Sequence, residues 1–257
     1  MKFKEFLQLN EGINDPGILK AIFVVGIAAA GKSTISSPLK FYAKHIDVDA
    51  PQEYFSDKYN IDLSKDGNPE EKIRIRKLGK RITSNEIINY ISGMLPMVVN
   101  VVGDDLERTT KRIKILRSFG YDVGMIYINT DLEKSVDRAY RRTYGKNKDK
   151  NRHVAAEYMY DAYQKLAQNV KQYQDLLFDR VEENKELLDF FIQIRNDGVI
   201  SDAVLDNIHN QIKKFLAAPM KNEKGAEILE KIKKQNKKML IDIIDKSKIE
   251  EKVKSWF

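Results

Sequence analysis

Short apolar runs recur along the chain and alternate with longer segments that show helical periodicity. The runs are nearly continuous and rich in branched side chains, which is typical of parallel strands buried on both faces. They predict strands at Leu19–Val25, Lys44–Val48, Met97–Val102, Val123–Asn129 and Leu187–Ile194.

The intervening segments place apolar residues three or four positions apart, as one buried helix face requires. They predict helices at Ser33–Tyr42, Ile73–Met94, Leu106–Phe119, Asp131–Thr143 and Ala155–Phe178. We expect Pro38 to kink or end the first of these helices. The alternation of strands and helices predicts a three-layer α/β fold with a mostly parallel sheet.

The two ends of the chain depart from this pattern. Residues Met1–Asn10 predict a short amphipathic helix, and a turn signal at Asn14–Gly17 separates it from the first strand. Beyond Ser201 the helical segments are rich in lysine, and they form either a helical appendage or a packing extension of the core. These segments are Ile208–Leu216, Ala226–Lys238 and Met239–Trp256. We therefore divide the chain into an N-terminal segment (1–15), a central α/β domain (16–204) and a helical C-terminal extension (205–257).

Composition limits the classes of function. The net charge of +7 favours anionic partners such as nucleotides, nucleic acid or acidic lipid, without choosing among them. Because the chain has no cysteine, disulfides, thiolate metal sites and cysteine nucleophiles are excluded. No apolar run reaches the roughly 18 residues of a membrane span, and the charged N-terminus lacks the apolar region of a secretory signal. We expect a cytoplasmic protein without a membrane partner.

The loop after the first strand carries a phosphate-binding motif. Residues 26–34 read Gly-Ile-Ala-Ala-Ala-Gly-Lys-Ser-Thr and match the P-loop pattern G-x-x-x-x-G-K-[ST] in full. Glycine at both ends lets the loop wind so that backbone N–H groups face the phosphates of ATP or GTP. Lys32 is expected to bridge the β- and γ-phosphates, and the Ser33 hydroxyl to bind Mg²⁺. The residues predicted to hold the nucleotide are Gly26, Ala28, Ala29, Ala30, Gly31, Lys32, Ser33 and Thr34.

Two further groups bear on whether the phosphate is transferred to a hydroxyl. Asp47 and Asp49 follow the second strand, at the edge where open α/β sheets bind ligands, so a carboxylate there can accept the proton of an attacking hydroxyl. Capping of the next helix is the alternative role, and it stays open for Asp49. A set of arginines brackets the polar segment 144–151 and predicts a cationic lid over the γ-phosphate, with a solvated helix face as the alternative. These arginines are Arg138, Arg141, Arg142 and Arg152.

The end of the third strand departs from the usual P-loop pattern. An aspartate normally holds Mg²⁺ there, whereas this chain presents Asn100. A neutral amide can orient a water molecule but supplies no charge, so we expect weaker Mg²⁺ binding. Asp104 or Asp105, a few residues further on, can compensate.

The order of these features resembles the zeta-toxin-like P-loop kinases, especially the copies carried by large tailed bacteriophages. The resemblance runs from about Ile13 to Pro219 and rests on NDPGILKAIFVVGIAAAGKST, GDDLERT and FGYDVGMIYINTDLEKSVDRAYRR. It implies transfer of a phosphate from ATP or GTP to a hydroxyl, for example on a nucleotide-activated amino sugar. The roles that it implies are a base at Asp49, lid cations at Arg138, Arg142 and Arg152, and Asn196 near the nucleotide base. Family members usually show Asp-Gly-Thr-Gly-Arg-Asp where this chain has residues 100–105.

A second resemblance concerns the first residues. MKFKEFLQLNEG is similar to capsid-targeting segments of phage internal proteins, which implies cleavage after Glu11 and packaging in a virion, while a docking helix is the alternative.

Three functions therefore stay open: a kinase acting on a small hydroxyl acceptor, a polynucleotide kinase whose C-terminal helices grip the backbone, and a non-catalytic nucleotide-binding protein.

Overall fold

A five-stranded parallel sheet forms the centre of the molecule, with the strand order β2-β3-β1-β4-β5. The computed structural model describes residues 17–63, 67–144, 154–176, 187–196, 198, 200–234 and 245–257. The strands are β1 (Lys20–Val25), β2 (Lys44–Ile46), β3 (Met97–Val101), β4 (Asp122–Asn129) and β5 (Phe190–Arg195). Each predicted strand is present, and the predicted α/β class is confirmed.

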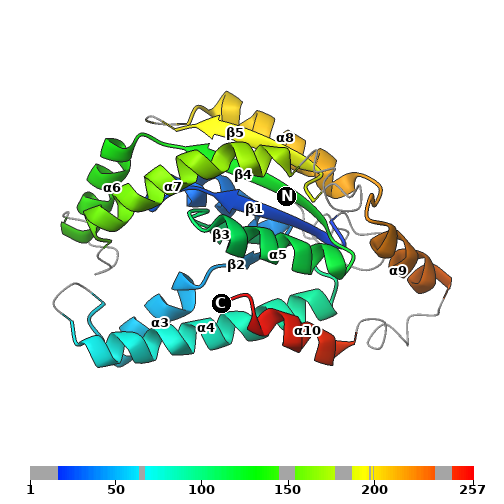
Figure 1. Cartoon of the computed structure of the whole chain (residues 1–257), viewed down its shortest axis with the longest axis horizontal. Helices are drawn as coiled ribbons and strands as arrows, with labels where there is room; N and C mark the ends of the chain where they lie inside the picture. Colours follow the sequence, from blue (N-terminus) through cyan, green and yellow to red (C-terminus); the bar gives the residue numbers. More distant parts are fainter. Residues whose placement is uncertain are drawn as a thin grey trace, which may run out of the picture.

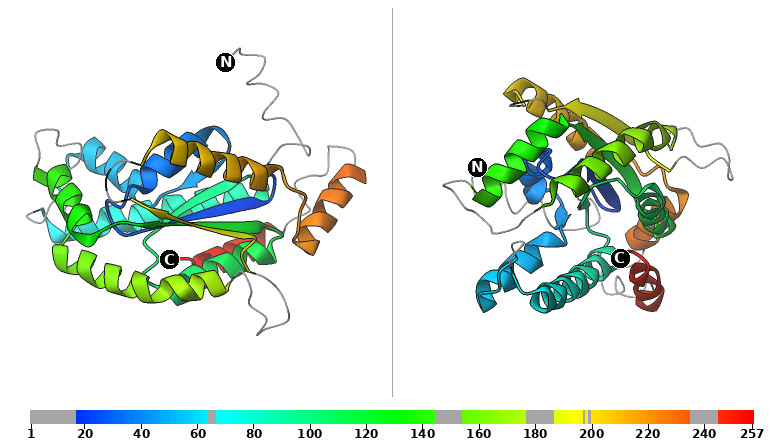
Figure 2. Two further views of the ribbon diagram at one scale, coloured as in Figure 1. Left: turned by 90° about the horizontal axis from the view of Figure 1, so that it is seen from above. Right: turned by 60° about the vertical axis from the view of Figure 1, so that its left-hand side comes forward.

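Helices cover both faces of this sheet. The left view of Figure 2 shows α2 and α8 on one side of the sheet and α5 and α7 on the other. The short pieces near the first two strands are α2 (Lys32–Ser36), the 3-10 helix η1 (Ser37–Phe41) and α3 (Asp49–Tyr59). The longer helices of the central part are α4 (Pro69–Ser92), α5 (Leu106–Ser118), α6 (Leu132–Tyr144) and α7 (Ala156–Asp175). Those of the C-terminal part are α8 (Asp202–Ala217), α9 (Glu223–Lys234) and α10 (Lys246–Lys254).

Burial follows the position of each strand in the sheet. Every residue of the central strand β1 is buried, whereas the edge strand β2 buries only Ile46. Strand β5 forms the other edge of the sheet, and its polar residues Gln193 and Arg195 are exposed. A parallel sheet covered on both faces requires this pattern, and it accounts for the apolar runs in the sequence.

Local chemistry explains where elements differ from their predicted bounds. The helix expected over Ser33–Tyr42 ends at Ser36 and continues as η1, with Pro38 in the first turn of that 3-10 helix. Helix α3 was not predicted as a separate element, because Asp49–Tyr59 has little apolar periodicity and buries none of its side chains. Strand β5 begins at Phe190 rather than Leu187, and the side chain of the preceding Asp189 takes part in a buried ion network.

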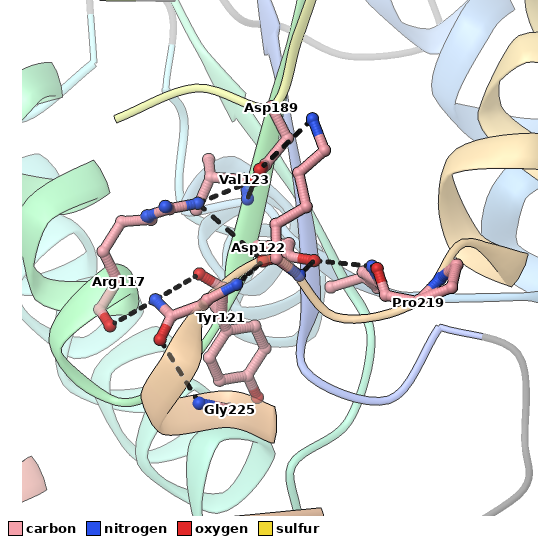
Figure 3. Close-up of polar contacts among 10 residues, drawn as sticks. Arg117, Tyr121, Asp122, Val123, Asp189, Pro219 and Gly225 are labelled. Carbon is pink, nitrogen blue, oxygen red and sulfur yellow. Dashed lines mark hydrogen bonds and ion pairs between the residues drawn. The ribbon is translucent and has the colours of Figure 1, made fainter. Parts of the chain in front are cut away.

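That network lies at the amino-terminal edge of the sheet (Figure 3). Lys20 Nζ lies 2.6 Å from Asp122 Oδ2, and both side chains are almost fully buried. Arg117 donates to Asp189 Oδ2 at 2.7 Å, and Asp189 Oδ2 also accepts from the backbone N–H of Val123. Nothing in the sequence distinguishes Lys20 from the rest of the predicted strand Leu19–Val25, so its pairing with Asp122 is evident only in the tertiary structure.

The C-terminal helices join the same hydrophobic cluster as the sheet. Ile212 of α8, Ile228 of α9 and Trp256 after α10 all belong to it. Of the two alternatives for this region, packing against the core therefore describes these helices, and α8 itself spans the predicted boundary at 204/205. The predicted N-terminal helix and the cleavage after Glu11 lie outside the described residues.

The last residues fasten α10 to the rest of the molecule. The Trp256 carbonyl accepts two hydrogen bonds from the Arg112 guanidinium of α5, at 3.0 Å from Nε and 2.7 Å from Nη2. Helix α10 also packs along α4, as Figure 1 shows. Within the part of the chain that the structure describes, no helix combines the length and apolar character that crossing a membrane demands.

Candidate active site

The P-loop winds through left-handed backbone conformations at two residues, of which one is the final glycine of the motif. It connects β1 to α2, and Ala29 (φ 57°) and Gly31 (φ 93°) adopt left-handed backbone conformations. Alternation of left- and right-handed residues turns successive backbone N–H groups toward one side, which creates a concavity for an anion. The Gly26 N–H donates to the Val101 carbonyl at 3.2 Å, so the start of the loop is fixed to the end of β3.

Lys32 is held within the loop by backbone carbonyls. Its Nζ lies 2.6 Å from the Gly26 carbonyl oxygen and 3.0 Å from that of Ile27. These contacts keep the ammonium group at the mouth of the loop, where it can exchange carbonyl oxygens for phosphate oxygens. Ser33 and Thr34 are both exposed at the start of α2.

Three side chains support the P-loop from behind. Asn196, which is buried, donates from Nδ2 to the Ala30 carbonyl at 2.7 Å, and the Thr130 hydroxyl donates to the same oxygen at 3.0 Å. Arg138 donates to the Asn196 Oδ1 at 3.3 Å and to the Gly198 carbonyl at 2.7 Å. Asn196 is therefore engaged with the loop backbone, and its predicted role near the nucleotide base stays a prediction.

Gly31 is required by this arrangement for two reasons. Its φ of 93° lies in the left-handed region that side chains disfavour. A Cβ at this position would also lie 2.4 Å from Asn196 Nδ2. The final glycine of the motif thus permits both the winding of the loop and the close approach of its supporting amide.

The predicted lid arginines do not share one environment. Arg138 also donates to the Ala29 carbonyl at 3.4 Å, so it contacts the loop from α6. Arg141 pairs with Asp137 one turn earlier, with Nε at 2.9 Å from Oδ2. Arg142 is exposed near the end of α6, and Arg152 lies outside the described residues. The structure thus brings Arg138 to the P-loop, and the lid roles of Arg142 and Arg152 stay predictions.

Asn100 lies one residue before the end of β3, and its predicted role as a Mg²⁺ ligand stays a prediction. It pairs in register with Val24 of β1, two residues before the P-loop. Its Oδ1 is buried and has no hydrogen-bond partner among the described residues. Asp104 follows the strand, and its Oδ1 accepts a hydrogen bond from the Asp105 N–H at 3.1 Å, while Asp105 caps α5 through the Arg108 N–H. The Asn100 oxygen is therefore a buried acceptor near the carboxyl end of β3 whose hydrogen-bonding capacity no described residue satisfies.

Helix α7 fixes the loop between Asn100 and α5. The Tyr173 hydroxyl donates to the Gly103 carbonyl at 2.8 Å, and Asn169 Nδ2 donates to the carbonyls of Gly103 and Asp104 at 3.1 and 3.0 Å. Burial raises the pKa of Tyr173 to about 12, so its hydroxyl keeps the proton that it donates. Nothing in the sequence pattern of α7 distinguished these two residues from ordinary helix positions.

A pocket of about 460 Å³ lies beside the P-loop edge of the sheet, between β2, α3 and α4. Asp47 is one of its walls, and Asp47 Oδ1 also accepts the Asp49 N–H at 2.9 Å, which caps the start of α3. Asp49 is the first residue of α3 and is half-buried. The residues that line the pocket are Lys40, His45, Asp47, Ala50, Pro51, Tyr54, Phe55, Ile82 and Glu86.

Burial shifts the pKa of two pocket groups in opposite directions. Desolvation raises the pKa of the Glu86 carboxyl above its ordinary value. Desolvation and then the positive charge of Lys40 lower the pKa of His45, while Asp47 acts weakly in the opposite direction. The pocket therefore favours neutral forms of both groups. Pockets that combine apolar walls with a few shifted ionisable groups are typical of ligand sites.

Helices α3 and α4 supply Tyr54, Phe55, Ile82 and Glu86 to this pocket, and α5 supplies none of the residues that line it. His45 lines the pocket as well, although no motif or spacing in the sequence distinguishes it. Among the described residues, no group of three or more His, Cys, Asp or Glu side chains gathers to hold a metal ion.

Comparisons with known proteins agree with this geometry. A protein-family model described as zeta toxin matches residues 11–191. A chain in a solved structure of the PezAT chromosomal toxin–antitoxin system of Streptococcus pneumoniae has a similar fold. Its TM-score is 0.54 at 15% identity, and the match covers 88% of this chain and 92% of that one.

Lower similarity links the chain to a shikimate kinase from Bacteroides thetaiotaomicron (TM-score 0.41, 13% identity, 77% of this chain and 99% of that one). A gluconokinase from Sinorhizobium meliloti has a TM-score of 0.39 and 15% identity, and the match covers 78% of this chain and 93% of that one. No curated protein sequence matches.

Proposed function

The chain belongs to the zeta toxin family, and we propose that it is a kinase that transfers the γ-phosphate of ATP or GTP to a hydroxyl group of a small molecule. The observation that carries this proposal is one juxtaposition. The wound P-loop and an acceptor-sized pocket with carboxylates lie at the same edge of the sheet. A nucleotide-sugar or nucleoside-like acceptor suits the mixture of aromatic, apolar and ionisable walls.

In the proposed reaction the P-loop binds the nucleotide and Asp49 activates the acceptor. The P-loop N–H groups and Lys32 hold the β- and γ-phosphates and offset the charge that develops during transfer. Asp49 accepts the proton of the acceptor hydroxyl, whose oxygen forms the new bond to the γ-phosphorus as the bond to ADP or GDP breaks. Arg138 positions the loop through the Ala29 carbonyl and Asn196.

Magnesium fits the oxygen donors near the loop. Mg²⁺ prefers oxygen ligands and keeps several waters, and the accessible Ser33 hydroxyl and the unpartnered, buried Asn100 Oδ1 are donors of that kind. Asp104 adds a carboxylate beyond the strand end. When bound, the metal neutralises phosphate charge. Asn100 supplies none itself, so we expect Mg²⁺ affinity below that of a site with an aspartate.

Exchanging single carboxylates tests the assignment of the base. Asp49→Asn is expected to abolish phosphate transfer and to leave nucleotide affinity unchanged, while Lys32→Ala weakens nucleotide binding itself. Asp47→Asn is the matched control, because an asparagine oxygen can still accept the Asp49 N–H. Labelled transfer from γ-labelled ATP, in parallel with nucleotide titration, measures both quantities. Normal transfer by Asp49→Asn together with loss in Asp47→Asn would move the base to Asp47.

The acceptor can be identified directly. We expect that incubating the protein with γ-labelled ATP and a metabolite extract labels a compound in the wild type but not in Lys32→Ala. Mass spectrometry of the labelled compound then gives the acceptor.

Asn100 favours one other function, a nucleotide-binding protein that does not transfer phosphate. This alternative predicts nucleotide binding with no labelled product from any extract. The substitution Asn100→Asp separates the two. For a weak kinase it should tighten Mg²⁺ binding and raise transfer, whereas a non-catalytic protein should gain metal affinity and still form no product.

A further inference from the structure

The exposed face of α4 carries a dense cluster of positive charge. Between Glu71 and Glu86 the chain contains basic residues and no acidic one. The exposed basic residues of this face are Arg74, Arg76, Lys77, Lys80 and Arg81. They occur on a helix that runs along one side of the molecule, beside α3 (Figure 1). We call these five residues the α4 basic face.

Aromatic rings lie on the neighbouring helix. Tyr54 and Tyr59 of α3 are 60% and 56% exposed, which is unusual for side chains of this size. Lys58 Nζ lies 5.8 Å from the centre of the Tyr54 ring and 5.7 Å from that of Tyr59. Phe55 and Tyr59 stack, with 5.8 Å between centroids and 11° between planes. Helix α3 thus presents flat aromatic surfaces interleaved with a cation.

Helices α3 and α4 pack against each other, so the candidate surface is formed by the α3 rings together with the basic face of the neighbouring helix. A Cβ at Gly79 would lie 2.6 Å from Gln52 Cγ and 3.3 Å from the Val48 carbonyl oxygen. Glycine at this position lets the start of α3 pack closely on the buried side of α4.

We propose that this surface binds the backbone of single-stranded nucleic acid, with bases stacked on the α3 rings. A cationic track beside stacking platforms is the combination that sequence-tolerant single-strand binding uses. Three of the five cations are arginines, whose planar guanidinium groups pair with phosphate in bidentate fashion. The proposal goes beyond the kinase reaction and does not depend on it.

The same surface is poorly suited to a membrane. A helix that lies on a bilayer inserts an apolar face into it. The apolar face of α4 is already buried in the fold through Ile75, Ile87 and Ile91, and Ile73 is its one exposed large apolar side chain. A membrane is therefore left as an outcome of the test.

Charge neutralisation tests the basic face. The probe is a short fluorescein-labelled oligothymidylate, and binding is followed by fluorescence anisotropy without nucleotide. Because each phosphate contact contributes about −0.7 to the log–log salt slope, replacing Arg76, Lys77 and Lys80 by Gln should lower the slope by about 2. The loss in affinity at about 0.1 M salt is then about 100-fold. The matched control replaces the exposed Lys231, Lys233 and Lys234 of α9 by Gln and should leave affinity unchanged.

The aromatic part is tested separately with Tyr59, which does not line the pocket. Tyr59→Ala should weaken oligothymidylate binding by about five- to 150-fold, the equivalent of about 1–3 kcal/mol per stacked base. Tyr59→Phe keeps the ring and should bind as the wild type does. Both sets of variants are expected to keep the ATP affinity of the wild type, which separates this proposal from the kinase function.

Three results would overturn the proposal. The first is equal oligothymidylate affinity of the wild type and the α4 triple variant. The second is a loss of affinity in the α9 control as large as that in the α4 variant, and the third is binding that does not depend on salt. Vesicles that contain phosphatidylserine provide the last comparison. Adsorption to these vesicles, lost in the α4 variant and without any affinity for the oligothymidylate, would reassign the basic face to a membrane surface.

Discussion

At the scale of single residues, the buried polar side chains carry the most specific information. Asn196 and Lys20 are both buried, and each is matched with a partner from a distant part of the chain. Asn196 reaches the Ala30 carbonyl, and Lys20 reaches Asp122. Neither contact follows from spacing, because a buried ion pair or amide contact depends on which strands become neighbours.

Loss of one member of the buried pair should be costly. Lys20→Met leaves the Asp122 carboxylate buried without its ammonium partner, although Arg117 Nη1 remains 3.9 Å from Oδ1 and the backbone N–H groups of Lys221 and Asn222 still donate to the carboxylate. We expect a loss of about 3–5 kcal/mol in the free energy of unfolding, measured by urea denaturation. The control is Lys233→Met, since the exposed Lys233–Glu230 pair is expected to contribute at most about 1 kcal/mol. Equal losses in the two variants would contradict the argument.

His45 should make stability depend on pH. Its pKa in the folded protein is lowered, mainly by burial, so the unfolded chain takes up a proton first as the pH falls through about 6.5. The contribution of His45 to the free energy of unfolding is therefore fully present above about pH 6.5. It is lost as the pH falls from there toward the lower pKa of the folded protein, with a slope of at most about 1.4 kcal/mol per pH unit. Denaturation at a series of pH values should show a flatter profile for His45→Phe. Lys40→Gln should move the folded pKa upward and narrow the pH window.

At the scale of elements, the P-loop is a loop whose shape is set from outside. Gly31 adopts its left-handed conformation without a Cβ penalty, whereas Ala29 is held in one, and β1 and β3 fix the start of the loop. Helix α6 and the segment after β5 then hold its centre through Arg138 and Asn196. Anion binding therefore depends on residues about 100 or more positions away in the chain, such as Thr130 and Asn196.

A double substitution separates the two demands on Gly31. Gly31→Ala should weaken ATP binding strongly, because the new Cβ meets both a left-handed φ and Asn196 Nδ2. Combining it with Asn196→Ala removes the clash but not the backbone strain, and it also removes the hydrogen bond to Ala30. We expect partial rescue relative to Gly31→Ala, with affinity still at least about tenfold below that of the wild type, since αL strain costs about 1–2 kcal/mol. Isothermal titration with ATP measures each step, and full rescue would show that the clash alone matters.

At the scale of the whole molecule, the C-terminal segment completes the core. Trp256 is 1% exposed and lies in the same cluster as the sheet, and its carbonyl accepts from Arg112. Desolvation lowers the pKa of Arg112 to about 10, which is far enough above neutrality to keep its charge. Since α10 also packs on α4, the segment 245–257 braces the helix that carries the pocket residues Ile82 and Glu86.

Truncation of the tryptophan tests this bracing. Trp256→Ala should lower the free energy of unfolding by about 3–5 kcal/mol, the usual cost of removing a large buried ring. Circular dichroism is the appropriate measurement, because Trp256 is the chain's one tryptophan and its removal abolishes the fluorescence signal. Lys254→Ala, at an exposed position of α10, should change stability by less than about 0.5 kcal/mol. An equally small effect of Trp256→Ala would show that the end of the chain does not stabilise the core.

The sequence by itself determined the α/β class, the approximate position of every strand and the P-loop, because hydrophobic periodicity and a nine-residue motif are local properties. The roles of Asn100 as a Mg²⁺ ligand and of Asp49 as the base stay predictions, and the structure places Asn100 within β3 and Asp49 at the start of α3. The tertiary structure alone decided the strand order and the partner of Lys20. It also decided the support of the P-loop by Asn196 and Arg138, and the pocket around His45 and Glu86. The physical reason is that hydrogen bonds, ion pairs and pockets form between segments far apart in the chain, and their partners are fixed only when the sheet assembles.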